Sequence, residues 1–128
     1  KISNTYIDNN YVKSALISGI QWDIIMNIVN KKYDGNNQIY DVININESRH
    51  IGNKAKTGQN LADKVYNIYD LEGNYREWVA EKNTHYDIYP CINRGGDYEN
   101  ISPASKRNFG NSNPGSNVTF RLVLYVIK

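Results

Sequence analysis

The chain has 128 residues, enough for one domain with a modest core and too few for two. Its formal net charge is +2 and it contains no basic block, so the charge pattern indicates no nucleic-acid partner. No apolar run approaches the ~18 residues that a membrane-spanning helix needs, so no membrane insertion is expected. The single cysteine, Cys91, excludes an internal disulfide and a cysteine-based zinc site.

The sequence starts at Lys1 and shows no signal peptide. We therefore expect residues 1–128 to be a single domain that forms the C-terminal part of a longer chain. A homo-oligomer, if one forms, is expected to assemble through the missing N-terminal region. The polar residues 1–13 are read as one edge strand.

Residues 18–30 carry the clearest helix pattern of the chain. Ser18 and Gln21 stand at the positions of a capping box, and Ile17 with Trp22 fits a hydrophobic staple. Helical periodicity then predicts one apolar face, formed by Ile20, Ile24, Ile25 and Ile28 and widened by Met26 and Val29. The helix is expected to end near Asn30. Residues 34–60 then read as a long loop with a short strand candidate at residues 39–45.

The central stretch, residues 67–78, combines a turn signal, two acidic side chains and a tryptophan. Asp70 and Glu77 could supply carboxylate oxygens to calcium, with the backbone carbonyls of Gly73 and Tyr75 between them. The alternative is a glycine turn between two strands, with the tryptophan buried and both acids solvated. The spacing alone favours the turn.

The C-terminal third reads as a displayed loop between two pieces of sheet. Residues 79–90 are a polar excursion, and after them Arg94 precedes two glycines that permit positive φ or a close backbone approach. Arg94 is expected to pair with a buried carboxylate. Residues 98–117 are rich in Asn, Ser and Gly, and the apolar run at residues 120–127 predicts an interior strand after them.

A polar excursion that is held by sheet at both ends is typical of a binding loop. Tyrosine, serine and asparagine dominate antibody-like binding surfaces, since Tyr supplies rigid contact area and Asn and Ser supply adaptable hydrogen bonds. We therefore predict that ligand is bound by Tyr98, Asn100, Ser102, Lys106, Asn108, Phe109, Asn111 and Asn113.

Three ordered motifs resemble those of the formylglycine-generating-enzyme (sulfatase-modifying factor) family, a branch of the C-type-lectin fold. Residues 74–78 (NYREW) resemble its N-V/A-W-E-W signature, and residues 93–98 (NRGGDY) resemble its R-G-G-S-W/Y. Residues 116–123 (SNVTFRLV) resemble its closing N-x-G-F-R-V/L-V/A. The departures from the family are Tyr75 for a small residue, Arg76 for a tryptophan, Asp97 for a serine and Thr119 for a glycine.

The resemblance implies an α+β, C-type-lectin-like (formylglycine-generating-enzyme-type) domain with a small twisted antiparallel sheet, one main helix and long loops. It also implies a structural arginine at Arg94 and a calcium ion (Ca2+) at Asp70, Gly73, Tyr75 and Glu77.

The chemistry of the catalytic relatives is not expected in this chain. Those enzymes bind copper through a cysteine pair downstream of R-G-G, whereas no cysteine follows Gly96 here. Relatives that bind iron use histidines of a separate helical domain, and the two histidines His50 and His85 are isolated. We therefore expect no enzyme and no redox metal.

The chain is also similar to ligand-binding proteins that retroelements diversify in phages and bacteria. In those proteins the variable positions are often asparagine codons, and Asn100, Asn108, Asn111 and Asn113 are compatible with that pattern. The resemblance implies receptor recognition of a protein or glycan ligand on a cell or phage surface, with the domain on a virion, on a bacterial surface or secreted. The alternatives are a structural module of a phage tail or secreted assembly, and an inactive relative of a copper or iron oxidase.

Overall fold

The computed structural model describes residues 10–29, 32–33, 39–40, 53–59, 64–71, 73–100, 102, 104–111, 113, 115 and 117–127. One α-helix and ten short strands lie in these ranges, so the expected α+β class is confirmed. In chain order they are β1 (Val12–Leu16), α1 (Gly19–Val29), β2 (Lys32–Tyr33), β3 (Ile39–Tyr40), β4 (Lys64–Val65), β5 (Ile68–Tyr69), β6 (Arg76–Lys82), β7 (Cys91–Arg94), β8 (Arg107–Gly110), β9 (Val118–Phe120) and β10 (Leu122–Val126).

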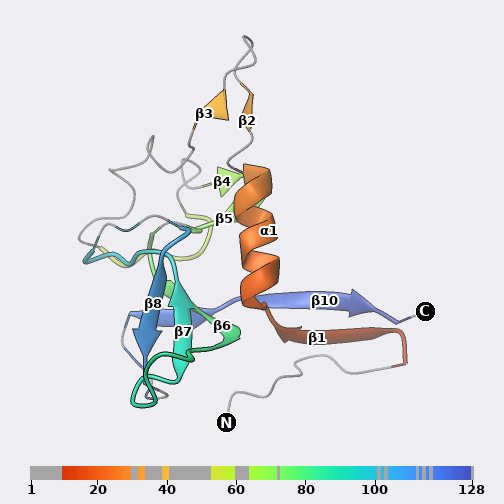
Figure 1. Ribbon diagram of the computed structural model, residues 1–128. Coiled ribbons are helices and arrows are strands. Elements are labelled where there is room, and N and C mark those ends of the chain that lie inside the picture. The colour runs from red at the N-terminus through yellow and green to blue at the C-terminus, as the bar shows by residue number, and fades with distance from the viewer. Residues whose placement is uncertain are drawn as a thin grey trace.

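The largest sheet has four strands in the order β8-β7-β6-β9, with α1 packed against β6 (Figure 1). The β6–β7 and β7–β8 pairs are antiparallel, but β9 runs parallel to β6. The predicted antiparallel sheet is therefore wrong in this pair, because the chain returns through the loop after β8 and enters β9 in the direction of β6. Three further pairs, β1–β10, β2–β3 and β4–β5, are antiparallel.

The start of α1 follows the predicted capping box. The Ser18 amide donates to Gln21 Oε1 at 2.9 Å, and the Gln21 amide donates to Ser18 Oγ at 3.2 Å. Ile17 and Trp22 are both fully buried, as a hydrophobic staple requires. The Trp22 indole N–H donates to the Ala104 carbonyl at 2.8 Å, so this residue also ties α1 to the loop before β8.

The predicted apolar face of α1 is wrong in part. Trp22, Met26 and Val29 are buried and Ile25 packs against the core, whereas Ile20, Ile24 and Ile28 are 75%, 52% and 56% exposed. Both groups recur with helical spacing, so periodicity alone could not tell which faces inward. The contact with β6 selects the stripe that contains the tryptophan. The core cluster comprises Ile17, Trp22, Met26, Val29, Leu71, Val79, Ile92 and Ala104.

The predicted interior strand at residues 120–127 is also wrong. The run divides at Arg121, so that β9 joins the main sheet while β10 pairs with β1, Val12 opposite Val126 and Leu16 opposite Leu122. This two-stranded ribbon extends away from α1 (Figure 1). Val123 packs against the core, but Leu124 and Val126 are 64% and 78% exposed. β10 pairs with β1 in a separate two-stranded sheet and does not enter the four-stranded sheet.

Two sequence predictions lie largely outside the described residues. The edge strand was expected at residues 1–13, of which residues 1–9 are not described. The strand in this region, β1, overlaps the expected range at residues 12 and 13. Of the strand candidate at residues 39–45, the structure describes Ile39–Tyr40, which form β3. No helix in the described part of the chain is long and apolar enough to span a bilayer.

Candidate ligand-binding surface

The turn after β7 requires a glycine at position 95. Gly95 has φ +80°, and a Cβ built on it would lie 2.9 Å from the Leu71 carbonyl oxygen. Its amide donates to the Lys106 carbonyl at 3.2 Å, and its carbonyl accepts from Asn108 Nδ2 at 3.0 Å. The predicted need for positive φ or a close backbone approach is therefore confirmed at Gly95.

The Asp97 carboxylate closes the loop that follows. Its side chain is fully buried and accepts from Arg76 Nη2 at 2.8 Å and from Asn117 Nδ2 at 2.9 Å. It also accepts from the amides of Glu99 and Asn100, at 2.9 and 2.8 Å, which is a local turn that aspartate favours. One side chain thus joins the start of the loop to β6 and to the segment before β9.

The contact between Arg76 and Asp97 is an ion pair. A buried carboxylate needs such a partner, since an unpaired charge in the interior is costly.

Two members of the predicted ligand-binding set are buried. Tyr98 is 7% and Ser102 is 5% exposed. The Tyr98 ring packs edge-to-face on Tyr75 with centroids 5.7 Å apart, and its amide donates to the Asn74 carbonyl at 3.1 Å. These side chains support the loop from within and leave little surface for a ligand. We call Gly95, Asp97, Tyr98 and Ser102 the loop root.

The other six members lie in edge strand β8 or in the segments before and after it (Figure 1). Asn100 and Lys106 are exposed before the strand, and Asn111 and Asn113 are exposed after it. Within β8 the neighbours Asn108 and Phe109 point to opposite faces, and Phe109 is 48% exposed. The structure therefore places Lys106, Asn108, Phe109 and Asn111 in or directly beside one edge strand, and the Asn108 side chain donates to the Gly95 carbonyl.

The loop between β6 and β7 adds aromatic residues that sequence reasoning missed. The Tyr86 ring lies edge-to-face on Phe109 with centroids 5.5 Å apart. Tyr86, Ile88 and Tyr89 are 53%, 72% and 43% exposed. The one available signal was three large side chains within four residues of an otherwise polar excursion. We call the five exposed members of the predicted set, together with Tyr86, Ile88 and Tyr89, the β8 strip.

The aromatic loop is held by one buried asparagine. Asn83 is 4% exposed, and its Nδ2 donates to the Tyr89 carbonyl at 2.8 Å. Its amide donates to the Pro90 carbonyl at 3.0 Å, and its Oδ1 accepts from the His85 amide at 2.9 Å. These bonds give the loop a defined shape, so Tyr86 and Tyr89 are presented from an ordered turn.

An ionic cluster attaches β7 and β8 to the helix. Arg94 is 1% exposed and binds Asp23 of α1, whose carboxylate also accepts from Arg107 at 2.6 Å. Arg107 Nε donates to Glu81 at 2.9 Å. The predicted pairing of Arg94 with a carboxylate is confirmed, but Asp23 is 40% exposed and so is not buried. Burial lowers the pKa of Arg94, while the charge of Asp23 opposes that change.

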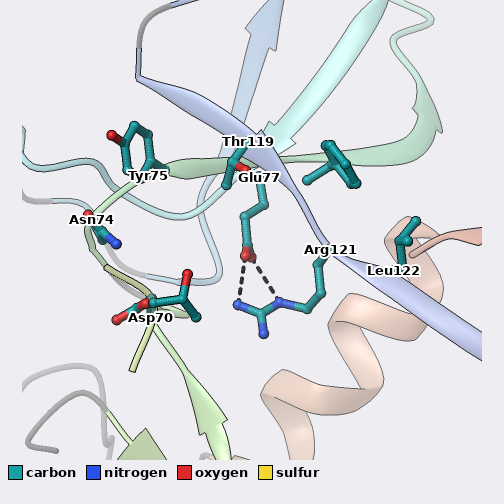
Figure 2. A pocket seen from close by; sticks show the side chains of 9 residues that line it. Asp70, Asn74, Tyr75, Glu77, Thr119, Arg121 and Leu122 are labelled. Carbon is teal, nitrogen blue, oxygen red and sulfur yellow. Dashed lines mark hydrogen bonds and ion pairs between the residues drawn. The ribbon is translucent and has the colours of Figure 1, made fainter. Parts of the chain in front are cut away.

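Glu77, one of the residues predicted to bind calcium, is bound by Arg121 (Figure 2). Both carboxylate oxygens of Glu77 accept from Arg121, Oε1 from Nη2 at 2.6 Å and Oε2 from Nε at 3.2 Å. Arg121 Nη2 also donates to the Tyr69 carbonyl at 2.8 Å, and the Gly73 carbonyl accepts from the Tyr75 amide at 2.8 Å. A guanidinium thus neutralises the carboxylate that calcium would need.

The arrangement does not fit the predicted ion. Calcium takes six to eight oxygen ligands, and two of the four predicted groups are already engaged. Across the described ranges, no group of three or more His, Cys, Asp or Glu side chains could hold a metal. Calcium binding stays a prediction that this geometry does not favour. Burial raises the pKa of Glu77 to about 7, although the charge and hydrogen bonds of Arg121 lower it.

Comparison with known proteins places the fold. No family model matches the chain, and no curated protein matches it. Among solved structures it is similar to Treponema denticola variable protein 1, with a TM-score of 0.54 and 20% identity over 91% of this chain and 49% of that one. The chain thus spans about half the length of that protein. A C-type-lectin-like fold is compatible with this similarity, whereas the formylglycine-generating-enzyme branch is not shown.

Proposed function

We propose that this domain is a non-catalytic binding module that recognises a macromolecular ligand through the β8 strip. The observation that carries the proposal is the exposed aromatic cluster of Tyr86, Tyr89 and Phe109 beside exposed asparagines. Large aromatic side chains contribute most of the binding energy in many protein interfaces, and asparagines adapt their hydrogen bonds to different partners. Lys106 adds a positive charge at one end.

The division between strip and root supports this proposal. If many different side chains are to be tolerated at the binding surface, the loop that carries them must be held in place by other residues. The loop root provides one, since Asp97 and Tyr98 hold the loop through buried contacts. Changes in the β8 strip can therefore alter recognition at little cost to folding.

We further propose that the strip is diversified by a retroelement. The solved protein with the similar fold is named a variable protein, and Asn100, Asn111 and Asn113 are exposed here. The ligand is then a protein or glycan on a cell or phage surface, and the domain acts on a virion, on a bacterial surface or after secretion.

Sequencing of the coding region across many individuals of one population tests the diversification. We expect replacements to concentrate at Asn100, Asn111 and Asn113 and at other residues of the strip. Asn93 is the matched control, because it has the same codon choice but is 4% exposed in β7. A reverse transcriptase gene beside a near-copy of this coding segment is also expected. Equal variation at Asn93 and Asn111, or none at either, would reject the diversification.

A display library separates recognition from diversification. Randomising the strip should leave most clones folded, and selection on intact bacterial cells should enrich clones that differ at Tyr86 and Phe109. Randomising the loop root instead should leave few folded clones. If selection enriches no particular residues at Tyr86, Phe109 or the other strip positions, the binding surface lies elsewhere.

A further inference from the structure

A pocket of about 440 Å³ lies beside the Glu77–Arg121 ion pair and shares no residue with the β8 strip (Figure 2). Its size falls in the range of small-molecule sites. Its lining combines charged and amide side chains with aromatic and aliphatic ones. The lining residues are Thr57, Asp70, Asn74, Tyr75, Glu77, Thr119, Phe120, Arg121 and Leu122.

Asp70 lines this pocket. The residue is 7% exposed, its Oδ2 accepts from the Gly58 amide at 3.3 Å, and its buried Oδ1 has no hydrogen-bond partner among the described residues. Asp70 also has φ +56°, a left-handed conformation that few non-glycine residues adopt. A buried carboxylate oxygen without a donor is costly, and strained residues cluster at functional sites.

The neighbouring polar groups do not compensate Asp70. Arg121 donates to both oxygens of Glu77 and to the Tyr69 carbonyl. The Asn74 amide is engaged with Ala55, from which it accepts at 3.1 Å and to which it donates at 3.0 Å. Above about pH 7, where Glu77 is ionised and neutralises Arg121, the Asp70 carboxylate leaves one negative charge in the pocket.

The apolar lining residues suit a short apolar group. Tyr75, Phe120 and Leu122 line the pocket, and Phe120 is 46% exposed. Aromatic rings attract cations through their electron-rich faces, and the methylene stem of an amine packs well on apolar side chains. The pocket therefore combines a carboxylate with one oxygen that lacks a donor and apolar side chains on which the stem of an amine can pack.

We propose that this pocket binds an organic cation, an ammonium or guanidinium group on a short apolar stem, whose N–H donates to Asp70 Oδ1. The same chemistry is found in a lysine or arginine side chain of a partner and in a small free amine. An inorganic divalent cation fits less well, because it needs several oxygen ligands.

Titration of the whole domain with n-butylammonium, followed by amide NMR shifts, tests the proposal. We expect saturable shifts at residues around Asp70 and none with 1-pentanol, which has a similar shape without the charge. Asp70→Asn should weaken butylammonium binding by about tenfold or more, since the charge-assisted hydrogen bond is lost. Asparagine tolerates the left-handed backbone, so the variant should fold. The exposed carboxylate of Asp87, changed to asparagine, is the control and should leave affinity unchanged.

Of two further experiments, one shows whether the bound amine comes from a partner side chain or from a small molecule, and the other replaces Asp70→Asn if that variant does not fold. A capped Gly-Lys-Gly peptide that binds as tightly as butylammonium indicates a partner side chain, whereas binding of the free amine alone indicates a small molecule. Should Asp70→Asn not fold, Phe120→Ala replaces it, and it should weaken butylammonium more than methylammonium. Equal binding of pentanol, unchanged affinity in both variants, no binding of any amine, or calcium binding that excludes butylammonium would each overturn the proposal. None of these outcomes bears on the β8 strip.

Discussion

The loop root and the β8 strip are built from the same kinds of residue, yet the structure uses them in opposite ways. Asp97 and Tyr98 in the root are 3% and 7% exposed, whereas Phe109 in the strip is 48% exposed and Asn111 is also exposed. The difference lies in the partners. Asp97 meets Arg76 and two backbone amides, while the strip lies along an edge strand with a neighbour on one side. Polar composition alone therefore does not mark a binding surface.

The largest test of this contrast is the removal of the Asp97 carboxylate. Asp97→Ala leaves Arg76 without its ion-pair partner and takes the acceptor from Asn117 and two amides. We expect a loss of about 3–5 kcal/mol in the free energy of unfolding, as for other broken buried pairs. Urea denaturation measures it. The exposed Asp87→Ala should stay within about 0.5 kcal/mol, and similar losses in both variants would contradict the assignment of the root.

A matched pair of aromatic residues sharpens the comparison. Tyr98 and Phe109 each make one edge-to-face contact, but only Tyr98 is buried. Tyr98→Ala should cost about 2–4 kcal/mol, because it opens a cavity beneath the loop. Phe109→Ala should cost about 1 kcal/mol or less, since the ring is half in solvent. Thermal or urea unfolding of the two variants decides the order, and equal costs would show that the strip is part of the core.

The pH dependence of stability should come from the scaffold. Burial raises the pKa of Glu77 from the ordinary 4.5 to about 7, so the folded state holds a proton that the unfolded state has released. The stability from this group is fully present below pH 4.5 and is lost as the pH rises through about 7, on the order of 1–3 kcal/mol. Urea midpoints of the wild type and Glu77→Gln should be similar at pH 4.5, where Glu77 carries its proton. They should diverge toward pH 8, as the wild type loses the stability from this group. A difference that does not change with pH would mean that Arg121 keeps Glu77 ionised throughout.

The smallest effects are expected in the strip itself. Tyr86→Ser and Asn111→Ser should change the free energy of unfolding by about 0.5 kcal/mol or less, because both side chains are exposed. The same changes should alter recognition of any ligand found by display. Aromatic anchors commonly contribute more than about 1 kcal/mol to binding, so Tyr86→Ser should weaken it at least several-fold. Ligand binding that is unchanged in both variants would indicate that the ligand binds another surface.

Local signals in the sequence predicted much of the scaffold. The capping box at Ser18 and Gln21 formed as expected, because its bonds join residues three apart. The turn at Gly95 needed positive φ, which glycine adopts without strain. The pairing of Arg94 with a carboxylate also followed, since a buried guanidinium requires a partner. Each of these features depends on a few residues and on chemistry that is the same in any fold.

Long-range contacts decided the rest. The sequence indicated that Trp22 would be buried, but it could not show that Ile20 would face solvent, because Ile20 also lies on a helical repeat of apolar residues. It could not show that Arg121, 44 residues from Glu77, would bind the Glu77 carboxylate. Nor could it show that Tyr98 would be buried while Tyr86 joined Phe109 in the strip. The sequence by itself determined the residue types and the local turns and caps. The tertiary structure decided which polar and aromatic side chains acquire partners and become buried, because those partners come from distant strands.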